Sequence, residues 1–270
     1  MDKILTFKIE ENVIIRDFLK SVFSENIAKR IKSVLGNMTV NGEPVIANQR
    51  LYKGDELKIF LEENSKPYGF AKDVGLKVLY SDEDLLVVVK GKGVCSMATN
   101  GHTEDCLFAG LEYLYPGEVF RIVTRLDKDT EGLVLIAKNA LAHSILNESH
   151  IVKKYTALLS GIVESDQVID APIARGDGII RFVSSNGQRA VTKLKVLGYS
   201  EGNTIAELEL LTGRTHQIRV HTAHIGHPIV GDTLYGDAKG EYNSGQELKC
   251  TYLRFLQPFT KEKIEVFYDL

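Results

Sequence analysis

The chain has 270 residues, 44% of them hydrophobic and 26% charged, with a formal net charge of −3. This is the composition of an ordinary globular protein with room for about two domains, and the charge gives no overall sign of a polyanion-binding protein. Three widely spaced cysteines argue against a disulfide framework or a cysteine zinc site, and no apolar stretch is long enough to span a membrane. We therefore expect a cytoplasmic protein that does not contact a membrane.

Residues 1–62 predict a small domain of two helices followed by a sheet. Apolar residues recur at helical spacing in two successive groups, which are Ile15, Phe18, Leu19 and Val22, and then Ile27, Ile31, Val34 and Leu35. Asn41 and Gly42 give a strong hairpin-turn signal between short strand patterns. The polar residues 63–72 are expected to form a linker to a second domain over residues 73–270.

The second expected helix carries a compact positive patch. The patch consists of three side chains that lie outside the apolar face of this helix, namely Lys29, Arg30 and Lys32. Such a patch suits contacts with the phosphates of a nucleic acid. Charge alone favours the simpler interpretation, a solvated helix face.

Residues 73–270 predict a larger domain that mixes strands and helices. Strands are expected at residues 78–80, 85–89, 155–159, 189–196, 205–211, 251–256 and 263–268, and helices at residues 106–115 and 140–150. The apolar run at residues 133–137 is typical of a strand buried on both faces, which the chain enters through a tight turn at Gly132.

Asp127 lies just before this buried strand, between Arg125 and the turn. A loop supported by a rigid sheet is a common place for reactive groups, and a neighbouring guanidinium keeps a carboxylate ionised, as a nucleophile or a base requires. Taken alone, these residues fit better with an aspartate that caps the turn and pairs with Arg125 for structure.

The wider pattern around Asp127 is more specific. Arg-Leu-Asp-x-x-Thr-x-Gly-Leu-x-Leu at residues 125–135, followed by Ala-Lys-Asn, resembles the catalytic motif of the RluA-type RNA pseudouridine synthases. The resemblance implies that Asp127 is the essential catalytic residue. Arg125 becomes a candidate for filling or holding the gap that a flipped nucleotide leaves. The chain departs from the family pattern at Thr124, where histidine is usual.

A second motif surrounds Tyr155. A tyrosine in a strand is most often a half-buried packing residue, but the pattern Lys-x-Tyr-x-Ala-Leu at residues 153–158 is similar to the second motif of the same family. The resemblance implies that Tyr155 stacks on the target base. Lys153 is a candidate substrate contact, although its stem would also serve to cover the strand.

A third motif, Gly-Arg-Thr-His-Gln-Ile-Arg-Val-His at residues 213–221, precedes Gly-His-Pro-Ile-x-Gly-Asp-x-x-Tyr-Gly at residues 226–236. Residues 214–225 predict a helix that Gly226 ends. Both patterns resemble the family's third motif, which implies a basic residue paired with the catalytic aspartate. Arg219 is the first candidate and Arg214 the second. The histidines here lack the spacing of a zinc motif, so we expect no metal.

The N-terminal segment carries a resemblance of its own. The order of its elements over residues 12–62, with Val-Asn-Gly-Glu-Pro-Val at residues 40–45, looks like the S-four type RNA-binding domain. The resemblance implies that Lys29, Arg30 and Lys32 contact RNA.

Together the resemblances imply an α+β protein whose larger domain has a mixed, mainly antiparallel sheet flanked by helices. They imply isomerisation of uridine to pseudouridine in structured RNA, a redox-neutral reaction that needs no cofactor. Large-subunit ribosomal RNA is favoured over transfer RNA, and a monomer is expected. Two alternatives stay open, a non-catalytic RNA-binding factor of ribosome assembly and a metal hydrolase built on the histidines.

Overall fold

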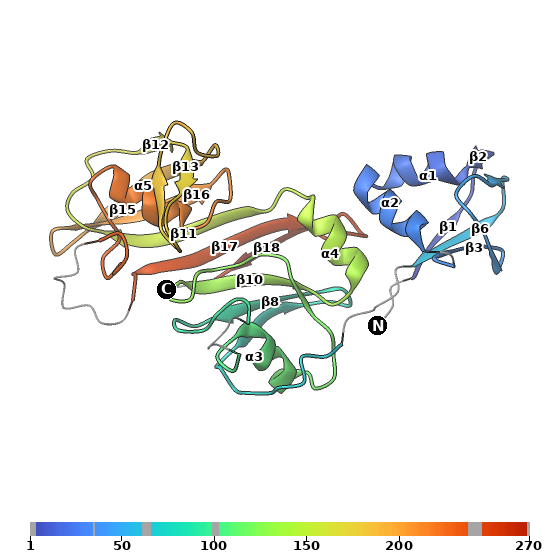
Figure 1. Cartoon of the computed structure of the whole chain (residues 1–270), viewed down its shortest axis with the longest axis horizontal. Helices are drawn as coiled ribbons and strands as arrows, with labels where there is room; N and C mark the ends of the chain where they lie inside the picture. Colours follow the sequence, from blue (N-terminus) through green and yellow to red (C-terminus); the bar gives the residue numbers. More distant parts are fainter. Residues whose placement is uncertain (1–3, 35, 61–65, 99–102, 237–244, 269–270) are drawn as a thin grey trace.

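The computed structural model of the protein describes residues 4–34, 36–60, 66–98, 103–236 and 245–268. These residues form two parts, each with its own sheet and its own buried core (Figure 1). The expected boundary at residue 62 and the beginning of the expected linker fall outside the described residues. Among the described helices, none is both long enough and apolar enough to cross a membrane.

The N-terminal part packs two short helices on a small sheet. The helices are α1 (Ile15–Val22) and α2 (Glu25–Ser33), and the sheet has the order β1 (Ile4–Lys8), β6 (Glu56–Phe60), β3 (Met38–Val40) and β4 (Glu43–Pro44), with β2 (Val13–Ile14) paired to β5 (Arg50–Leu51). Ser24 caps α2 by accepting a hydrogen bond from the Ile27 amide at 3.3 Å. The expected order of elements is present, and β1 is an additional strand that the sequence pattern did not predict.

The two parts share buried surface through α4 (Ala140–Asn147). Ala140 and Leu141 are buried in the core of the N-terminal part, and Arg30 of α2 donates a hydrogen bond to the hydroxyl of Ser144. Figure 1 shows α4 on the side of the large sheet that faces α2. The N-terminal part is therefore docked on the body of the protein.

The C-terminal part is organised by a ten-stranded sheet. Its continuous order is β12 (Gln167–Asp170), β15 (Val191–Ser200), β16 (Asn203–Leu210), β11 (Val152–Leu159), β17 (Leu248–Leu256), β10 (Glu131–Ala137), β8 (Leu85–Lys90) and β7 (Lys77–Ser81), while β18 (Lys263–Phe267) pairs with β17 and β9 (Arg121–Ile122) with β10. The pairings are antiparallel except between β10 and β17. The expected mixed, mainly antiparallel sheet is therefore confirmed.

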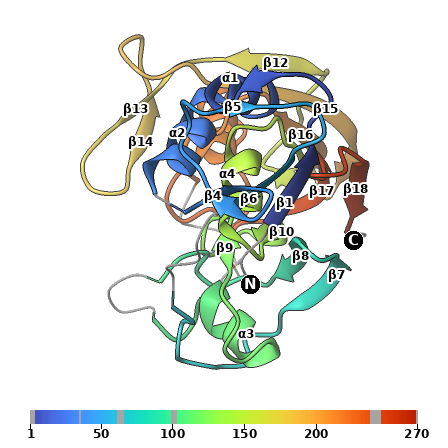
Figure 2. The same ribbon diagram turned by 90° about the vertical axis from the view of Figure 1, so that its right-hand side faces the viewer.

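Helices and a small hairpin complete this part. The helices are α3 (Leu107–Leu114), α4 and α5 (Gln217–His224), and the hairpin joins β13 (Ile173–Arg175) to β14 (Arg181–Val183). Figure 2 shows this hairpin standing off to one side of the body. The helix expected at residues 140–150 ends at Asn147, where the backbone leaves the helix through Glu148.

The start of β10 depends on a glycine. Gly132 has a φ of 119°, and a Cβ atom there would lie 2.3 Å from the carbonyl oxygen of Cys250 on β17. Only glycine permits this close approach of two parallel strands. The tight turn expected at Gly132 lies instead at residues 128–129, and Gly132 is the second residue of β10.

Candidate active site

The three sequence motifs meet at one cavity of about 480 Å³. Its wall includes Asp127 from the loop before β10, Lys153 and Tyr155 from β11, and Arg219 from α5. Asp127 and Arg219 are 92 positions apart in the chain, so it is the sheet that brings these side chains together.

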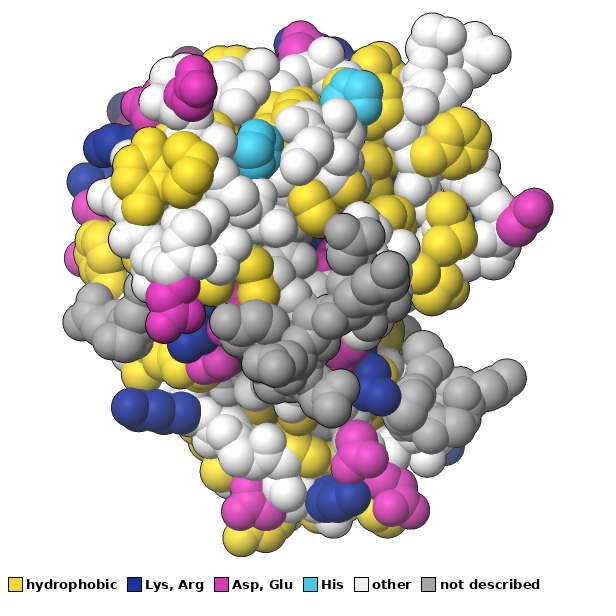
Figure 3. Space-filling view, turned by 90° about the vertical axis from the view of Figure 1, so that its left-hand side faces the viewer, with side chains coloured by type: hydrophobic (Ala, Val, Ile, Leu, Met, Phe, Trp, Pro, Cys, Tyr) yellow, Lys and Arg dark blue, Asp and Glu magenta, His cyan; other side chains and the backbone are white. Residues whose placement is uncertain are grey.

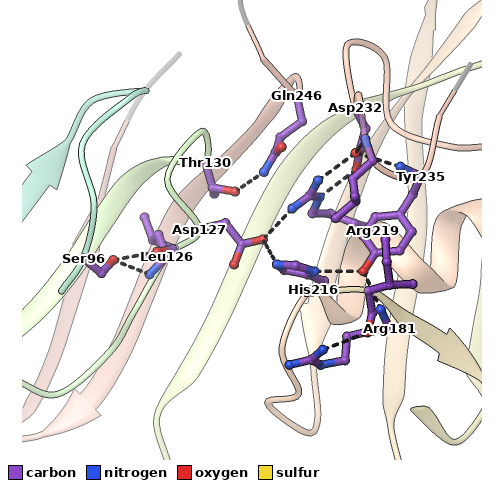
Figure 4. Close-up of polar contacts among 12 residues, drawn as sticks. Ser96, Leu126, Asp127, Thr130, Arg181, His216, Arg219, Asp232, Tyr235 and Gln246 are labelled. Carbon is purple, nitrogen blue, oxygen red and sulfur yellow. Dashed lines mark hydrogen bonds and ion pairs between the residues drawn. The ribbon is translucent and has the colours of Figure 1, made fainter. Parts of the chain in front are cut away.

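The backbone of the Asp127 loop is held on both sides of that residue (Figure 4). Before it, Ser96 Oγ donates to the carbonyl of Leu126 at 2.6 Å and accepts from the amide of Leu126 at 2.9 Å. After it, Gln246 Nε2 donates to the hydroxyl of Thr130 at 2.8 Å. The carboxylate of Asp127 is therefore presented from a fixed backbone.

A buried lysine, Lys90, also bonds to the backbone of the Asp127 loop. The ammonium group of Lys90, which is fully buried, donates to the carbonyl oxygens of Gly91, Val94 and Lys128 at 2.8–2.9 Å. Burial lowers the pKa of Lys90 to about 8, although nearby carboxylates act to raise it. Lys90 thus ties the end of β8 to the residue that follows Asp127.

Arg219 connects Asp127 to a second, deeper carboxylate. Its Nη1 lies 3.2 Å from Oδ2 of Asp127, while its Nε and Nη2 donate to the two oxygens of Asp232 at 2.7 and 2.8 Å. Arg219 is 7% exposed and Asp232 only 2%. The bidentate contact fixes the plane of the guanidinium, so that its remaining edge faces Asp127.

Asp127, Arg219 and Asp232 form a row of alternating charges, in which the pKa values of Arg219 and Asp232 depend on their neighbours. Burial alone would lower the pKa of Arg219, but the hydrogen bonds and the charges of Asp232 and Asp127 raise it. Burial would likewise raise the pKa of Asp232, yet Arg219 and the backbone amides of Leu234 and Tyr235 hold it below its ordinary value. Arg219 and Asp232 are therefore both ionised at neutral pH.

The pairing of Asp127 with Arg125 that its neighbourhood in the sequence favours is wrong. Arg125 is exposed at the wall of the cavity, and the ion pair of Asp127 is with Arg219. The preceding residue, Thr124, is buried and accepts a hydrogen bond from the Leu135 amide at 2.9 Å. At this departure from the family pattern the side chain bonds to the backbone of β10.

His216 and Tyr235 are functional candidates that the sequence did not single out. The amide of Arg181 donates to the hydroxyl of Tyr235 at 2.9 Å, and this hydroxyl lies 2.8 Å from Nδ1 of His216. The network is satisfied when Tyr235 donates to Nδ1, which leaves the proton of His216 on Nε2. Nε2 lies 3.9 Å from Oδ2 of Asp127. Figure 4 shows this oxygen facing both Arg219 and His216.

The backbone conformation of His216 explains why the predicted start of the third-motif helix was wrong. The helix predicted from residue 214 begins at Gln217, because His216 adopts a left-handed backbone conformation with a φ of 56°. The side-chain oxygen of Gln217 accepts hydrogen bonds from the amide of Arg214 and the hydroxyl of Thr212, both at 2.9 Å. This bonding holds the chain in a tight turn before α5 and turns His216 towards Asp127.

If Asp127 is catalytic, we expect Tyr235→Phe to slow the single-turnover reaction about tenfold, because the Arg181 amide and Nδ1 of His216 lose a partly buried hydrogen-bond partner. Burial lowers the pKa of His216, and the hydroxyl that donates to its ring also favours the neutral form. The acid limb of the pH–rate profile should therefore move to higher pH in the variant. Tyr252→Phe, in a separate cavity, is the matched control. An unchanged rate and pH profile would show that the contact of Tyr235 with His216 does not support Asp127.

Tyr155 and Lys153 line the cavity from β11. Tyr155 is 5% exposed, and burial raises its pKa well above the usual value. Its phenol therefore stays protonated, which favours a stacking role over that of a base. Burial lowers the pKa of Lys153, in keeping with an ammonium group that is partly withdrawn from water.

The remaining predicted contacts are spread out. Arg214 is exposed at the cavity wall, and its Nε donates to the carbonyl of Arg189 at 3.1 Å. The patch on α2 lies in the N-terminal part, where Lys29 pairs with Glu25 at 3.4 Å and Arg30 contacts Ser144 of α4. Arg30 therefore bridges the two parts of the protein, while Lys29 and Lys32 remain on the α2 surface.

The histidines of the third motif serve different purposes. His221 is fully buried, with Nδ1 2.9 Å from the hydroxyl of Thr192 and Nε2 2.9 Å from the carbonyl of Ala171. His227 Nδ1 lies 2.9 Å from the carbonyl of Ser160. Among the described residues, no three side chains of the kinds that bind metals lie close enough together to hold an ion.

Known proteins resemble this chain over most of its length. A family model described as RNA pseudouridylate synthase matches residues 84–224. The uncharacterized RNA pseudouridine synthase YjbO of Bacillus subtilis is 38% identical over 253 residues, covering 89% of this chain and 89% of the relative. Ribosomal large subunit pseudouridine synthase D of Pseudomonas aeruginosa is 34% identical over 256 residues, covering 90% and 79%.

Solved structures give the same match. Human RNA pseudouridylate synthase domain containing 1 superposes with a TM-score of 0.61 at 31% identity, covering 73% of this chain and 84% of that chain.

Proposed function

Because the chain belongs to the RluA-type family of RNA pseudouridine synthases, we propose that it converts specific uridines of large-subunit ribosomal RNA to pseudouridine, with Asp127 as the catalytic carboxylate. Members of this family are isomerases, so the protein is an isomerase and the family resemblance is confirmed. The expected α+β fold is confirmed as well. The choice of RNA is supported by the relative from Pseudomonas aeruginosa, which is named for the large ribosomal subunit.

The row Asp127–Arg219–Asp232 carries the catalytic part of this proposal. Asp232 holds the guanidinium in one orientation, and the guanidinium holds Oδ2 of Asp127 at 3.2 Å. The two contacts of the Asp127 carboxylate with described side chains, those of Arg219 and His216, both fall on Oδ2. Oδ1 is then the oxygen available to the ribose, and a pre-positioned charge of this kind needs no reorganisation during the reaction.

The reaction breaks the bond between C1′ of the ribose and N1 of uracil, and forms a bond between C1′ and C5. Asp127 acts on the ribose, either by attacking C1′ or by removing a proton next to it. After the base has rotated and rejoined, the proton on C5 leaves to solvent and N1 gains one, so that atoms and electrons balance without a redox partner. The contact of Arg219 with Oδ2 holds the Asp127 carboxylate in place for either first step.

The target base must leave its stack to reach Asp127. Tyr155 is placed on the cavity wall where it can support the base by stacking, and Lys153 lies beside it. Arg125, which is exposed at the same cavity, is the candidate to fill the gap left in the RNA. Arg214, which also lines this cavity, is a candidate phosphate contact.

Tritium release tests this function. Uridine labelled at C5 loses its tritium to water when pseudouridine forms, so we expect release from large-subunit ribosomal RNA and much less from transfer RNA. Release from transfer RNA alone would overturn the choice of substrate. Tight binding to both RNAs without release from either would identify a non-catalytic RNA-binding factor.

The N-terminal part is proposed to bind RNA as an S-four type domain. Its helix–helix–sheet order supports this role, as does the placement of Lys29 and Lys32 on the α2 surface. Basic side chains on a helix surface contribute affinity for phosphates without reading the base sequence.

We expect the double variant Lys29→Gln, Lys32→Gln to bind ribosomal RNA several-fold more weakly, with a salt dependence reduced by about 1–2 in slope. Filter binding at several salt concentrations measures both quantities. Lys77→Gln with Lys263→Gln is the matched control, because Lys263, like Lys29, pairs with a nearby glutamate. Equal losses in the two double variants would argue against a special role for α2.

A further inference from the structure

A second cavity of about 440 Å³ lies beside the catalytic one. It is enclosed by the hairpin β13–β14, the turn at residues 186–188 and the loop that leads into α5. The two cavities share Gly213, Arg214 and Thr215 in their walls. In Figure 2 the hairpin that forms one side of this cavity stands clear of the sheet.

The wall of this second cavity is rich in positive charge. Three arginines line it, namely Arg175 from β13, Arg181 from β14 and Arg214 from the loop before α5, and none of the ten lining residues is acidic. The chain as a whole has a net charge of −3, and Figure 3 shows acidic and basic side chains interspersed on the face at the left end of Figure 1. The concentration of uncompensated charge in one hollow therefore points to an anion.

The donors of this wall suit a phosphate group. Guanidinium groups match the oxygens of phosphate in pairs, and the amides of Asn186 and Gln188 and the hydroxyl of Thr215 can donate further bonds. Arg181 Nη1 is held by the carbonyl of Ile180 at 2.7 Å and Arg214 Nε by that of Arg189 at 3.1 Å. These bonds fix each guanidinium and leave its other N–H groups for a ligand.

We propose that this cavity binds a backbone phosphate of the RNA strand that carries the target uridine, one step along the strand from the flipped nucleotide. This inference rests on the proposed function, because the shared wall places any anion bound here next to the base in the catalytic cavity. The hairpin also carries the Arg181 amide that holds Tyr235, so the phosphate is gripped by an element joined to the catalytic network. Binding of this phosphate holds the RNA strand in place while the adjacent target nucleotide flips into the catalytic cavity.

Arg175→Gln tests the cavity without touching the catalytic network, because Arg175 is exposed and is not part of the wall around Asp127. We expect RNA affinity to fall about tenfold and the salt slope of binding to decrease by about 0.7–0.9. The single-turnover rate at saturating RNA should stay the same. Lys77→Gln, which removes one charge from an exposed residue of β7 at the far edge of the sheet, should change neither quantity.

The phosphate is identified by neutralising one linkage at a time in an RNA substrate with methylphosphonate. At one linkage next to the target uridine, the intact protein should lose about tenfold in affinity. Arg175→Gln should lose clearly less at that linkage, because only Arg181 and Arg214 still contact the phosphate there. The phosphate site would be overturned if, at every linkage, the affinity lost on neutralisation simply added to the affinity lost in Arg175→Gln. Equal effects of Arg175→Gln and Lys77→Gln on affinity would also overturn it. If the intact protein released no tritium from RNA, the proposed function would fail, whereas affinity and salt slope would still decide on the cavity.

Discussion

Replacing Asp127 with asparagine is expected to abolish pseudouridine formation while leaving the fold intact. An amide has nearly the shape of a carboxylate, but it can neither attack C1′ of the ribose nor remove a proton from it, so the rate should fall by at least about three orders of magnitude. The surrounding hydrogen bonds made by the side chains of Ser96, Thr130 and Gln246 do not involve the Asp127 side chain. The variant should therefore still bind RNA.

Tritium release under single-turnover conditions measures this loss, and filter binding measures the affinity that should remain. Asp129→Asn is the matched control, because Asp129 is a carboxylate on the same loop that is absent from the wall of the catalytic cavity. It should keep most of the activity. Release by Asp127→Asn at a rate near that of the intact protein would refute the assignment of the catalytic carboxylate.

Replacing Asp232 with asparagine is expected to lower the free energy of unfolding by about 3 kcal/mol, because it leaves the buried charge of Arg219 without its main partner. Asp232 accepts two hydrogen bonds from Arg219 and two more from the amides of Leu234 and Tyr235. The guanidinium would also lose its fixed plane and shift relative to Asp127. A shift of about 1 Å in such a group costs roughly 10²-fold in rate.

Urea denaturation measures the loss of stability, and single-turnover tritium release measures the loss of activity. The control is Asp166→Asn, in which an exposed carboxylate that accepts a hydrogen bond from the backbone amide of Val196 is changed in the same way. It should cost less than about 1 kcal/mol and leave the rate unchanged. A variant at Asp232 as stable and as active as the control would show that the Arg219 orientation does not depend on this residue.

Periodicity predicted the parts of the fold that local pattern determines. The two N-terminal helices have strong apolar periodicity, and the run at residues 133–137 is buried throughout in β10. β1 escaped prediction because its pattern is only half buried, and it is held by pairing with β6, some 50 positions away. The parallel pairing of β10 with β17 is a matter of tertiary packing that no local pattern encodes.

The partners of Asp127 show the same limit at the site. Nearness in the sequence favoured Arg125, two positions from Asp127. The structure instead places Arg219, 92 positions further along the chain, against the carboxylate. Arg219 was nominated only through the family resemblance. The boundary of α5 was missed because the left-handed conformation of His216 follows from side-chain bonding by Gln217, which helical spacing cannot reveal.

The sequence showed Asp232 and Tyr235 only as positions of a motif and assigned neither of them a role. The pattern Gly-Asp-x-x-Tyr-Gly at residues 231–236 marked a region of interest, but it gave no reason to bring these residues to the guanidinium of Arg219. The structure supplies that reason in two contacts, the bidentate bond of Asp232 and the ring of Tyr235, whose centroid lies 5.1 Å from the guanidinium carbon.

The docking of the N-terminal part has a consequence for how RNA is chosen. Ala140 and Leu141 are buried in its core, so it cannot swing away from the catalytic cavity without exposing apolar surface to water. A module on a loose tether would raise the local concentration of many RNA shapes alike. On its proposed role, a docked module instead works as a ruler, which accepts RNA whose two points of contact lie one fixed span apart.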